Sequence, residues 1–235
     1  MHIEELDFDV DGEKLVATKV LAAADRPPVV VHLHGLGATA NRHGVRYLLD
    51  ELALGGTSSL TFDYSGNGDS TGELTGTTLG RRFAETVAAA RHLAEGEPPV
   101  LLGTSMGAYL AAAAVPVLRP RALVLFVPAA YPAGCDDHPF DGTLVGPGAY
   151  PDSPAFSGLR EFDGDLLILA ARQDQVVPSD VVGAYLTNAT SARTTRVVEL
   201  DCDHFVHRWL PGRPAELARV HAELARIVTT TTTTH

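Results

Sequence analysis

The chain has 235 residues, of which 45% are hydrophobic, and no Pro/Gly/Ser-rich linker divides it. It is therefore expected to fold as a single domain over residues 1–228 with one well-buried core. The 18 basic and 29 acidic residues give a net charge of −11, which disfavours nucleic acid and anionic membrane surfaces as partners.

The termini and the cysteines indicate a soluble protein of a reducing compartment. The first ten residues carry acids rather than a basic stretch and an apolar run, so the sequence as given predicts no secretory signal. The longest apolar stretch, residues 108–118, contains Pro116 and is too short to cross a bilayer. Cys135 and Cys202 lack metal spacing and favour the cytoplasm, although their pairing stays open. Residues 229–235 are interpreted as a low-complexity tail or a cloning remnant.

Alternating strands and helices follow an N-terminal hairpin. Residues 3–10 and 15–21 form the hairpin, with Asp11-Gly12 as the turn signal. Short apolar runs typical of strands buried on both faces occupy residues 29–33, 59–62, 100–102, 122–126, 166–169 and 196–200. Helices are expected at residues 45–54, 77–95, 106–117, 179–186 and 214–228, the second with a charged face opposite its apolar one.

This alternation predicts an α/β fold, in which a mainly parallel sheet is covered by helices on both faces. Functional loops in such folds lie at the carboxyl ends of the strands. Residues 129–163 interrupt the pattern, because they are rich in Pro, Gly and Asp and lack a sustained period. They are interpreted as a short lid or loop excursion over the site.

The segment 100–108 predicts a nucleophile elbow. An apolar strand leads directly into Gly-Thr-Ser-Met-Gly at residues 103–107 and then into an Ala-rich helix. On such a turn the hydroxyl of Ser105 is exposed, and the sharp bend leaves no room for a Cβ at Gly103 or Gly107. The alternative is an ordinary turn with a capping serine, which needs no catalytic partners elsewhere.

Two later strand ends supply the partners that a nucleophilic serine requires. Asp174 follows the strand expected at residues 166–169, and His204 follows the strand expected at residues 196–200. An imidazole can accept the serine proton and a carboxylate can orient the imidazole. The chain order Ser105, Asp174, His204 is the order expected for this fold.

Other polar residues compete for these roles. His207 is expected in or beside the final helix, Asp201 and Asp203 flank His204, and Asp163 and Asp165 precede their strand and so lie at the wrong end of the sheet. His32 and His34 alternate along one strand but lack a third ligand, so no metal site is predicted.

The turn at residues 34–37 is the expected oxyanion site. Its sequence is His-Gly-Leu-Gly directly after a buried strand, and glycines allow the backbone to approach a substrate closely. We assign the backbone N–H groups of Leu36 and Met106 as the oxyanion donors. His34, Gly35 and Gly37 are expected to contact the substrate, whereas the alternative is a plain Gly-rich turn.

Together these motifs resemble the serine branch of the α/β-hydrolase superfamily over nearly the whole chain. The resemblance rests on the turn at residues 34–37, the loop Phe-Asp-Tyr-Ser-Gly-Asn-Gly-Asp-Ser at residues 62–70, the elbow, Asp174 with Val177-Pro178, and Asp203-His204. It is strongest with small bacterial carboxylesterases of the feruloyl-esterase and monoacylglycerol-lipase kind. Asn67 and Thr104 stand where those relatives usually have histidine, and the excursion is short for their inserted lid.

The resemblance and the constellation predict a cytoplasmic serine hydrolase that cleaves small carboxylic esters or thioesters through an acyl-serine, without a cofactor. An acyltransferase, perhydrolase or cyclase using the same triad is the alternative, and a non-catalytic ligand-binding relative is a third. A small-molecule substrate is the expected partner. The acyl group, the leaving group and the oligomeric state do not follow from the sequence.

Overall fold

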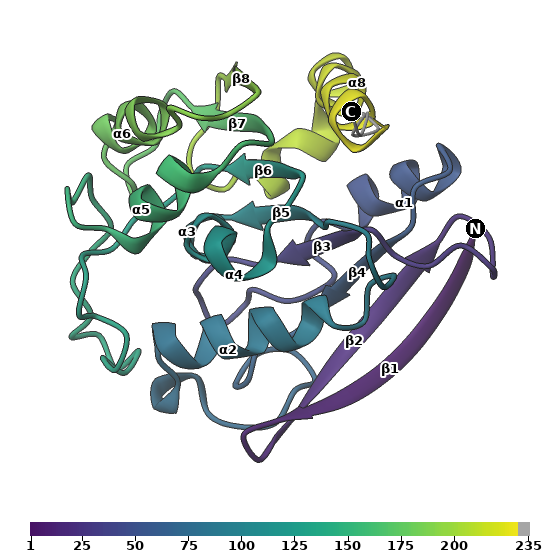
Figure 1. Cartoon of the computed structure of the whole chain (residues 1–235), viewed down its shortest axis with the longest axis horizontal. Helices are drawn as coiled ribbons and strands as arrows, with labels where there is room; N and C mark the ends of the chain where they lie inside the picture. Colours follow the sequence, from purple (N-terminus) through teal and green to yellow (C-terminus); the bar gives the residue numbers. More distant parts are fainter. Residues whose placement is uncertain (230–235) are drawn as a thin grey trace.

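An eight-stranded sheet lies at the centre of the computed structural model, which describes residues 1–229 (Figure 1). Its strands are β1 (His2–Val10), β2 (Glu13–Leu21), β3 (Val30–Leu33), β4 (Ser59–Phe62), β5 (Val100–Thr104), β6 (Ala122–Phe126), β7 (Asp165–Ala171) and β8 (Thr194–Leu200). They lie in the order β1-β2-β4-β3-β5-β6-β7-β8. The pairs β1/β2 and β2/β4 are antiparallel and all later neighbours are parallel, which confirms the predicted sheet and hairpin.

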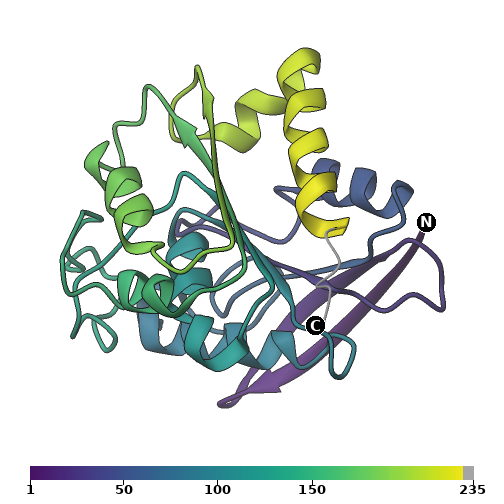
Figure 2. The same cartoon turned by 45° about the horizontal axis from the view of Figure 1, so that its top comes forward.

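Helices cover both faces of this sheet. The longer ones are α1 (Arg46–Leu54), α2 (Leu79–Ala90), α3 (Met106–Ala113), α5 (Pro154–Glu161), α6 (Asp180–Asn188) and α8 (Pro214–Thr229). Short helices are α4 (Val115–Leu118), α7 (Val206–Trp209), η1 (Leu74–Gly76) and η2 (Leu210–Gly212). The helices α1 and α8 pack together on one face, whereas α2, α3, α4, α5 and α6 cover the other (Figures 1 and 2).

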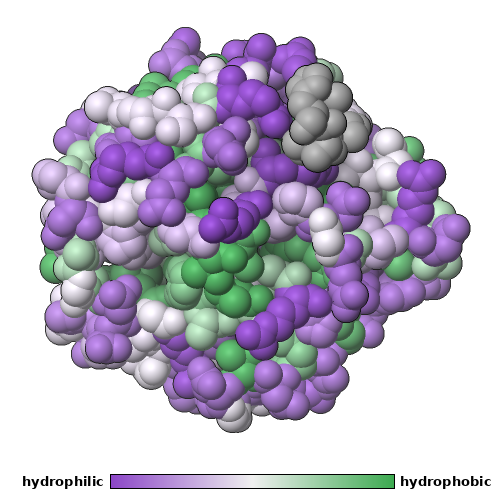
Figure 3. Space-filling model, in the orientation of Figure 1, coloured by the Kyte–Doolittle hydropathy of each residue, from purple (hydrophilic) through white to green (hydrophobic). Residues whose placement is uncertain are grey.

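Two apolar clusters hold these layers together. One joins the sheet to α2, α3, α5 and α6, and the other joins it to α1 and α8. The buried positions Val220, Leu224 and Ile227 of α8 recur at helical spacing, so burial of this face rather than helix propensity alone stabilises the helix. Most of the face shown in Figure 3 is hydrophilic, with apolar atoms gathered near its middle in the area that α3 and α4 occupy in Figure 1.

Local chemistry explains where the observed helices differ from the expected ranges. The side chain of Thr78 accepts a hydrogen bond from the N–H of Arg81 and caps α2, which ends at Ala90, five residues before the expected end. The helix expected at residues 106–117 divides into α3 and α4, because Pro116 lies in the first turn of α4 and cannot donate an N–H to a continuous helix.

The excursion at residues 129–163 differs from the expectation in structure and position. It contains α5, which packs on α3, where Gly158 approaches the carbonyl of Ala112 too closely for a Cβ. Its preceding loop bonds to the start of α2, since Phe140 N–H donates to Thr77 O and Gly80 N–H donates to Asp136 O. The sequence of this segment lacks a sustained hydrophobic period because its helix has only eight residues and is flanked by loops.

The remaining expectations concern the cysteines and the tail. Cys135 and Cys202 are both free and buried, so the described structure contains no bridge between them. Thr229 belongs to α8, and residues 230–235 of the predicted tail lie outside the described residues. Within residues 1–229, no helix combines the length and apolar character that crossing a membrane requires.

Candidate active site

The parallel register brings four loops to one edge of the sheet. Leu33 of β3 pairs with Gly103 of β5, and Ala171 of β7 pairs with Leu200 of β8. The segments that follow these strands therefore leave the sheet side by side at its carboxyl edge. They carry the predicted oxyanion turn, the predicted nucleophile, Asp174 and His204.

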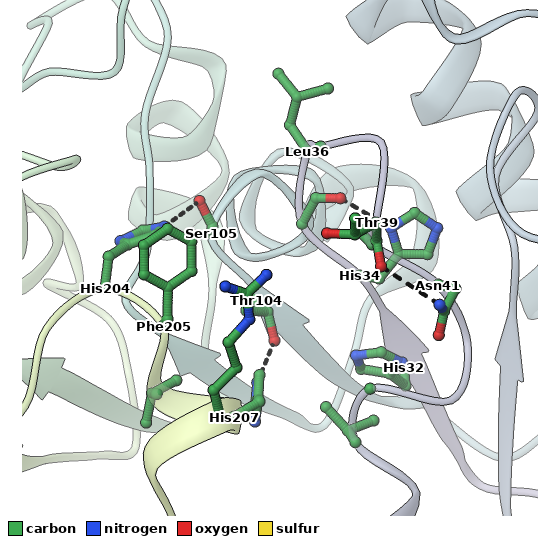
Figure 4. Close-up of a pocket in the computed structure, with 17 residues that line it drawn as sticks. His32, His34, Leu36, Thr39, Asn41, Thr104, Ser105, His204, Phe205 and His207 are labelled. Atoms are coloured by element: carbon green, nitrogen blue, oxygen red, sulfur yellow. Dashed lines mark hydrogen bonds between the residues drawn. The ribbon is translucent and has the colours of Figure 1, made fainter.

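Ser105 occupies a strained backbone position between β5 and α3. Its φ is 53° and its ψ is −112°, a conformation that L residues rarely adopt. The bend is fixed by main-chain hydrogen bonds, because Ser105 N–H donates to Phe126 O at 2.9 Å and Ser105 O accepts from Ala129 N–H at 3.2 Å. The strain points the hydroxyl out of the turn and toward His204 (Figure 4).

The three predicted catalytic side chains form one hydrogen-bonded line. His204 Nδ1 lies 2.7 Å from Asp174 Oδ2, and His204 Nε2 lies 3.0 Å from Ser105 Oγ. A carboxylate only accepts, so Nδ1 carries the hydrogen and Nε2 is left as an acceptor for the serine O–H. The side chains of His204 and Asp174 are 11% and 10% exposed, so both are largely shielded from solvent.

Asp174 is held by the backbone that follows it. Its Oδ1 accepts hydrogen bonds from the N–H groups of Val176 and Val177, both at 2.9 Å. The Asp174 loop is also tied to the His204 loop, because Gln173 N–H donates to Cys202 O and Gln173 Nε2 donates to Asp201 Oδ1. One carboxylate oxygen is thus fixed by main chain while the other faces His204.

The predicted oxyanion donors flank Ser105 from two sides. Met106 begins α3, and Leu36 lies in the turn after β3. Among residues 1–229, neither the N–H of Leu36 nor that of Met106 has an acceptor. A Cβ built on Gly35 would lie 3.3 Å from Thr104 O, so glycine permits the close approach of turn and elbow. Gly37 has a φ of 142°, which also favours glycine.

His34 has a different environment from the one expected of a substrate contact. Its Nδ1 lies 2.8 Å from Gly35 O and its Nε2 accepts from Tyr64 N–H at 3.2 Å. Both ring nitrogens are therefore used by main chain, and the ring orients the oxyanion turn. His34, Gly35 and Gly37 line the pocket, and their contact with a substrate stays a prediction.

A pocket of about 390 Å³ opens beside Ser105, between the oxyanion turn and the loop that carries His204. Its inner wall includes Thr104 and two further histidines (Figure 4). His207 Nε2 lies 2.8 Å from Thr104 Oγ1, and its Nδ1 lies 3.0 Å from Tyr47 OH. His207 lies in α7, a short helix that η2 joins to α8. No residue of the excursion 129–163 lines this pocket, so the excursion does not cover it.

The tautomer of His32 follows from its neighbours. Thr61 Oγ1 donates its only hydrogen to Arg42 O, so it must accept from His32 Nδ1, 2.9 Å away. His32 Nε2 is then an acceptor, and it has no donor among the described residues. Within residues 1–229, no group of three or more His, Cys, Asp or Glu side chains could hold a metal ion.

Burial sets the charge of the pocket histidines. It lowers the pKa of His34 to about 3 and that of His207 to about 3, and it lowers the pKa of His32 well below its usual range. These three rings are neutral near pH 7. Burial also raises the pKa of the Cys202 thiol to about 11, so this neighbour of the triad is not a competing nucleophile at neutral pH.

These pKa shifts predict how stability depends on pH. A histidine whose folded pKa is depressed is protonated first in the unfolded chain, so the stability it contributes is present above pH 6.5 and is lost as pH falls toward 3. Each of the three should lower the free energy of unfolding by about 1.4 kcal/mol per pH unit below pH 6. Urea unfolding at pH 7, 6 and 5 measures this slope.

Two variants test whether the buried histidines cause this pH dependence of stability. His207→Gln removes one buried titrating ring and should reduce the slope by about 1.4 kcal/mol per pH unit, whatever its stability at pH 7. His43→Gln, at an exposed position, should leave the slope unchanged. An identical slope in wild type and His207→Gln would contradict the prediction.

The loop at residues 62–70 packs against the oxyanion turn and bonds to its main chain. The buried carboxylate of Asp63 forms an ion pair with Arg42 and accepts from Asp69 N–H at 3.0 Å. Asn67, which stands where the resembling esterases usually have histidine, donates through Nδ2 to Gly37 O at 2.8 Å and to Ala40 O at 3.0 Å. Asn67 therefore holds the oxyanion turn in place.

The face of α2 expected to be charged is partly buried. Arg82 and Glu85 are fully buried, and Arg82 donates to Asn67 Oδ1 at 2.8 Å and to Ser65 O at 3.1 Å. Burial lowers the pKa of Arg82 to about 10 and raises that of Glu85. The sequence shows only that these residues are charged, and no spacing signal marks them as internal.

Known proteins resemble the chain in sequence pattern and in fold. Residues 25–139, which include Ser105 but neither Asp174 nor His204, match a protein-family model described as serine aminopeptidase, S33. No curated protein sequence matches the chain.

Solved structures share the fold at low identity. A structure of Est1E from Butyrivibrio proteoclasticus with bound ferulic acid has a TM-score of 0.73 at 17% identity, covering 96% of this chain and 100% of that chain. The esterase Pf2001 of Pyrococcus furiosus has a TM-score of 0.73 at 19% identity, covering 96% and 91%. A thioesterase domain from the curacin biosynthetic pathway has a TM-score of 0.68 at 16% identity, covering 94% and 100%. These similarities show that the chain has the α/β-hydrolase fold.

Proposed function

We propose that this protein is a serine hydrolase that cleaves small carboxylic esters or thioesters through an acyl-serine intermediate. The proposal is carried by the line from Ser105 Oγ through His204 to Asp174, with distances of 3.0 and 2.7 Å. These distances lie within the range in which a base can take the proton of a nucleophile.

In the first half of the reaction, Ser105 Oγ attacks the substrate carbonyl while His204 Nε2 takes its proton. The positive charge that develops on the imidazole is stabilised by Asp174, which holds the Nδ1 hydrogen. The carbonyl oxygen becomes negative and meets the N–H groups of Leu36 and Met106, which have no acceptor in the described structure. The start of α3 adds the positive end of a helix dipole at the same point.

In the second half, His204 returns the proton to the leaving alkoxide or thiolate, and the bond between the acyl carbon and the leaving group breaks. A water molecule then attacks the acyl-serine and gives one proton to His204. That proton passes to Ser105 Oγ as the acid departs, which regenerates the starting site. No step requires a cofactor.

The size and lining of the pocket support a small substrate. A volume of about 390 Å³ lies at the lower end of the range for small-molecule sites. The apolar side chains of Leu36 and Phe205 are 39% and 49% exposed beside Ser105 and offer contacts to a short acyl chain. The esterases and the thioesterase domain among the similar structures support an ester or thioester substrate.

The charges of the pocket argue against aminopeptidase activity, which the description of the matched family names. An aminopeptidase must bind the free ammonium group of its substrate, for which a carboxylate is the ordinary partner. No Asp or Glu is among the described residues that line the pocket, and Arg208 would repel an ammonium group.

Covalent labelling tests the proposal. A fluorophosphonate probe should attach to Ser105, as located by mass spectrometry of the digested protein, and short-chain 4-nitrophenyl esters should be hydrolysed. Ser105→Ala should show neither reaction, whereas Ser157→Ala, at an exposed serine of α5, should show both. Labelling at another residue, or ester turnover that persists in Ser105→Ala, would refute the assignment.

A further inference from the structure

The residues that line the pocket include one fixed positive charge and no negative one. Of the described residues that line it, only Arg208 carries a fixed charge, because burial keeps His32, His34 and His207 neutral near pH 7. No carboxylate lines the wall to neutralise Arg208. The chain has a net charge of −11, yet an exposed cation without a carboxylate partner lies among the residues that line the pocket beside the nucleophile.

The guanidinium of Arg208 is positioned by stacking rather than by an ion pair. Its central carbon lies 4.8 Å from the centroid of the Phe205 ring, and no carboxylate of the described residues pairs with it. The Phe205 ring lies beside His204, with centroids 5.9 Å apart (Figure 4). Stacking leaves the in-plane N–H donors of the guanidinium available, and these donors fit a carboxylate or phosphate in a two-pronged arrangement.

Carboxylates near His204 would oppose the approach of an anionic substrate. Asp174, Asp201 and Asp203 lie close enough to Cys202 to contribute to the raised pKa of its thiol. An anionic substrate that approaches His204 would meet the field of these carboxylates. Arg208 supplies the opposite charge from α7, four residues after His204.

We propose that Arg208 is a specificity-determining residue that selects substrates bearing a carboxylate or phosphate, located either on the acyl chain or on the leaving group. This inference rests on the proposed ester or thioester hydrolysis at Ser105. The anionic group binds the guanidinium in the pocket while the carbonyl lies at Ser105, so binding energy distant from the reacting bond orients the substrate.

Two matched substrate pairs identify the anion and its place. The first pair is 4-nitrophenyl butyrate and mono-4-nitrophenyl glutarate, which adds a carboxylate to the acyl chain. The second pair is S-butyrylpantetheine and its 4′-phosphate, which adds a phosphate to the leaving group. The kcat/KM ratio within each pair is measured for wild type, Arg208→Gln, Arg208→Lys and Arg213→Gln. Arg213 is the control, because it also stacks on an aromatic ring, Trp209, but does not line the pocket.

Wild type should prefer at least one anionic substrate over its neutral partner, and Arg208→Gln should lower kcat/KM for that substrate by about 10- to 100-fold. The same variant should change turnover of the neutral partner by less than about threefold. Arg208→Lys should retain part of the preference, since it keeps the charge but loses the planar donors, and Arg213→Gln should retain all of it. A wild type without preference in either pair, or an unchanged preference in Arg208→Gln, would overturn the proposal.

Binding to the inactive protein separates this inference from the hydrolytic reaction. Calorimetry should detect binding of the preferred anionic substrate to Ser105→Ala. The double variant Ser105→Ala/Arg208→Gln should bind that substrate about 10-fold or more weakly. If fluorophosphonate labelling fails but this binding difference is found, the hydrolytic function is wrong and the anion site stands. If labelling succeeds and the affinities are equal, the anion site is wrong and the hydrolase stands.

Discussion

Asp174→Asn should lower kcat for ester hydrolysis by about four orders of magnitude without unfolding the protein. The reason lies in the two backbone bonds to Asp174 Oδ1. The N–H groups of Val176 and Val177 demand an acceptor there, so the amide oxygen of the asparagine takes that place and its NH2 group faces His204. The imidazole must then present Nδ1 as an acceptor and carry its hydrogen on Nε2, where it can no longer take the proton of Ser105.

Asp203→Asn is the matched control for this substitution. Asp203 is adjacent to His204 in the sequence, is exposed, and accepts from Phe205 N–H through Oδ1 at 2.9 Å. Asparagine preserves that acceptor, so kcat should stay within about threefold of wild type. Steady-state kinetics with a short-chain ester and urea unfolding of both variants make the comparison. Asp174→Asn with more than a tenth of wild-type kcat would show that Asp174 does not orient the base.

The catalytic residues could be predicted because each one follows a strand in the sequence. Ser105, Asp174 and His204 each follow an apolar run typical of a buried strand, and the carboxyl ends of parallel strands lie at one edge of the sheet. The hairpin was predictable because its residues alternate between apolar and polar. The parallel strands were predictable because short continuous apolar runs are typical of strands buried on both faces. The three side chains then meet in the order that the sequence indicates.

The residues that escaped prediction act through contacts between distant segments. The charges of Arg82 and Glu85 suggested a solvated helix face, but the loop at residues 62–70 covers them and supplies their partners. Arg208 carries no motif, and its place on the pocket wall depends on how α7 turns after β8. The position of the excursion at residues 129–163 depends on packing against α2 and α3, which periodicity does not encode.

Gly107→Ala should lower the free energy of unfolding by at least about 4 kcal/mol, although it adds only one methyl group. A Cβ at Gly107 would overlap the carbonyl of Leu33 and lie 2.8 Å from His34 O. Both are main-chain atoms at the end of a central strand, so neither can move without displacing the oxyanion turn. The variant should therefore unfold at much lower urea concentration or fail to fold.

The same change at Gly183 provides the comparison. Gly183 is exposed in the interior of α6, and a Cβ there would meet nothing within 4 Å. Gly183→Ala should raise the free energy of unfolding by about 0.5–1 kcal/mol, because alanine loses less backbone entropy in a helix. Urea unfolding of both variants measures the contrast. Stability of Gly107→Ala within about 1 kcal/mol of wild type would mean that α3 and β3 do not approach so closely, and the two oxyanion donors would then lie too far apart to serve one oxygen.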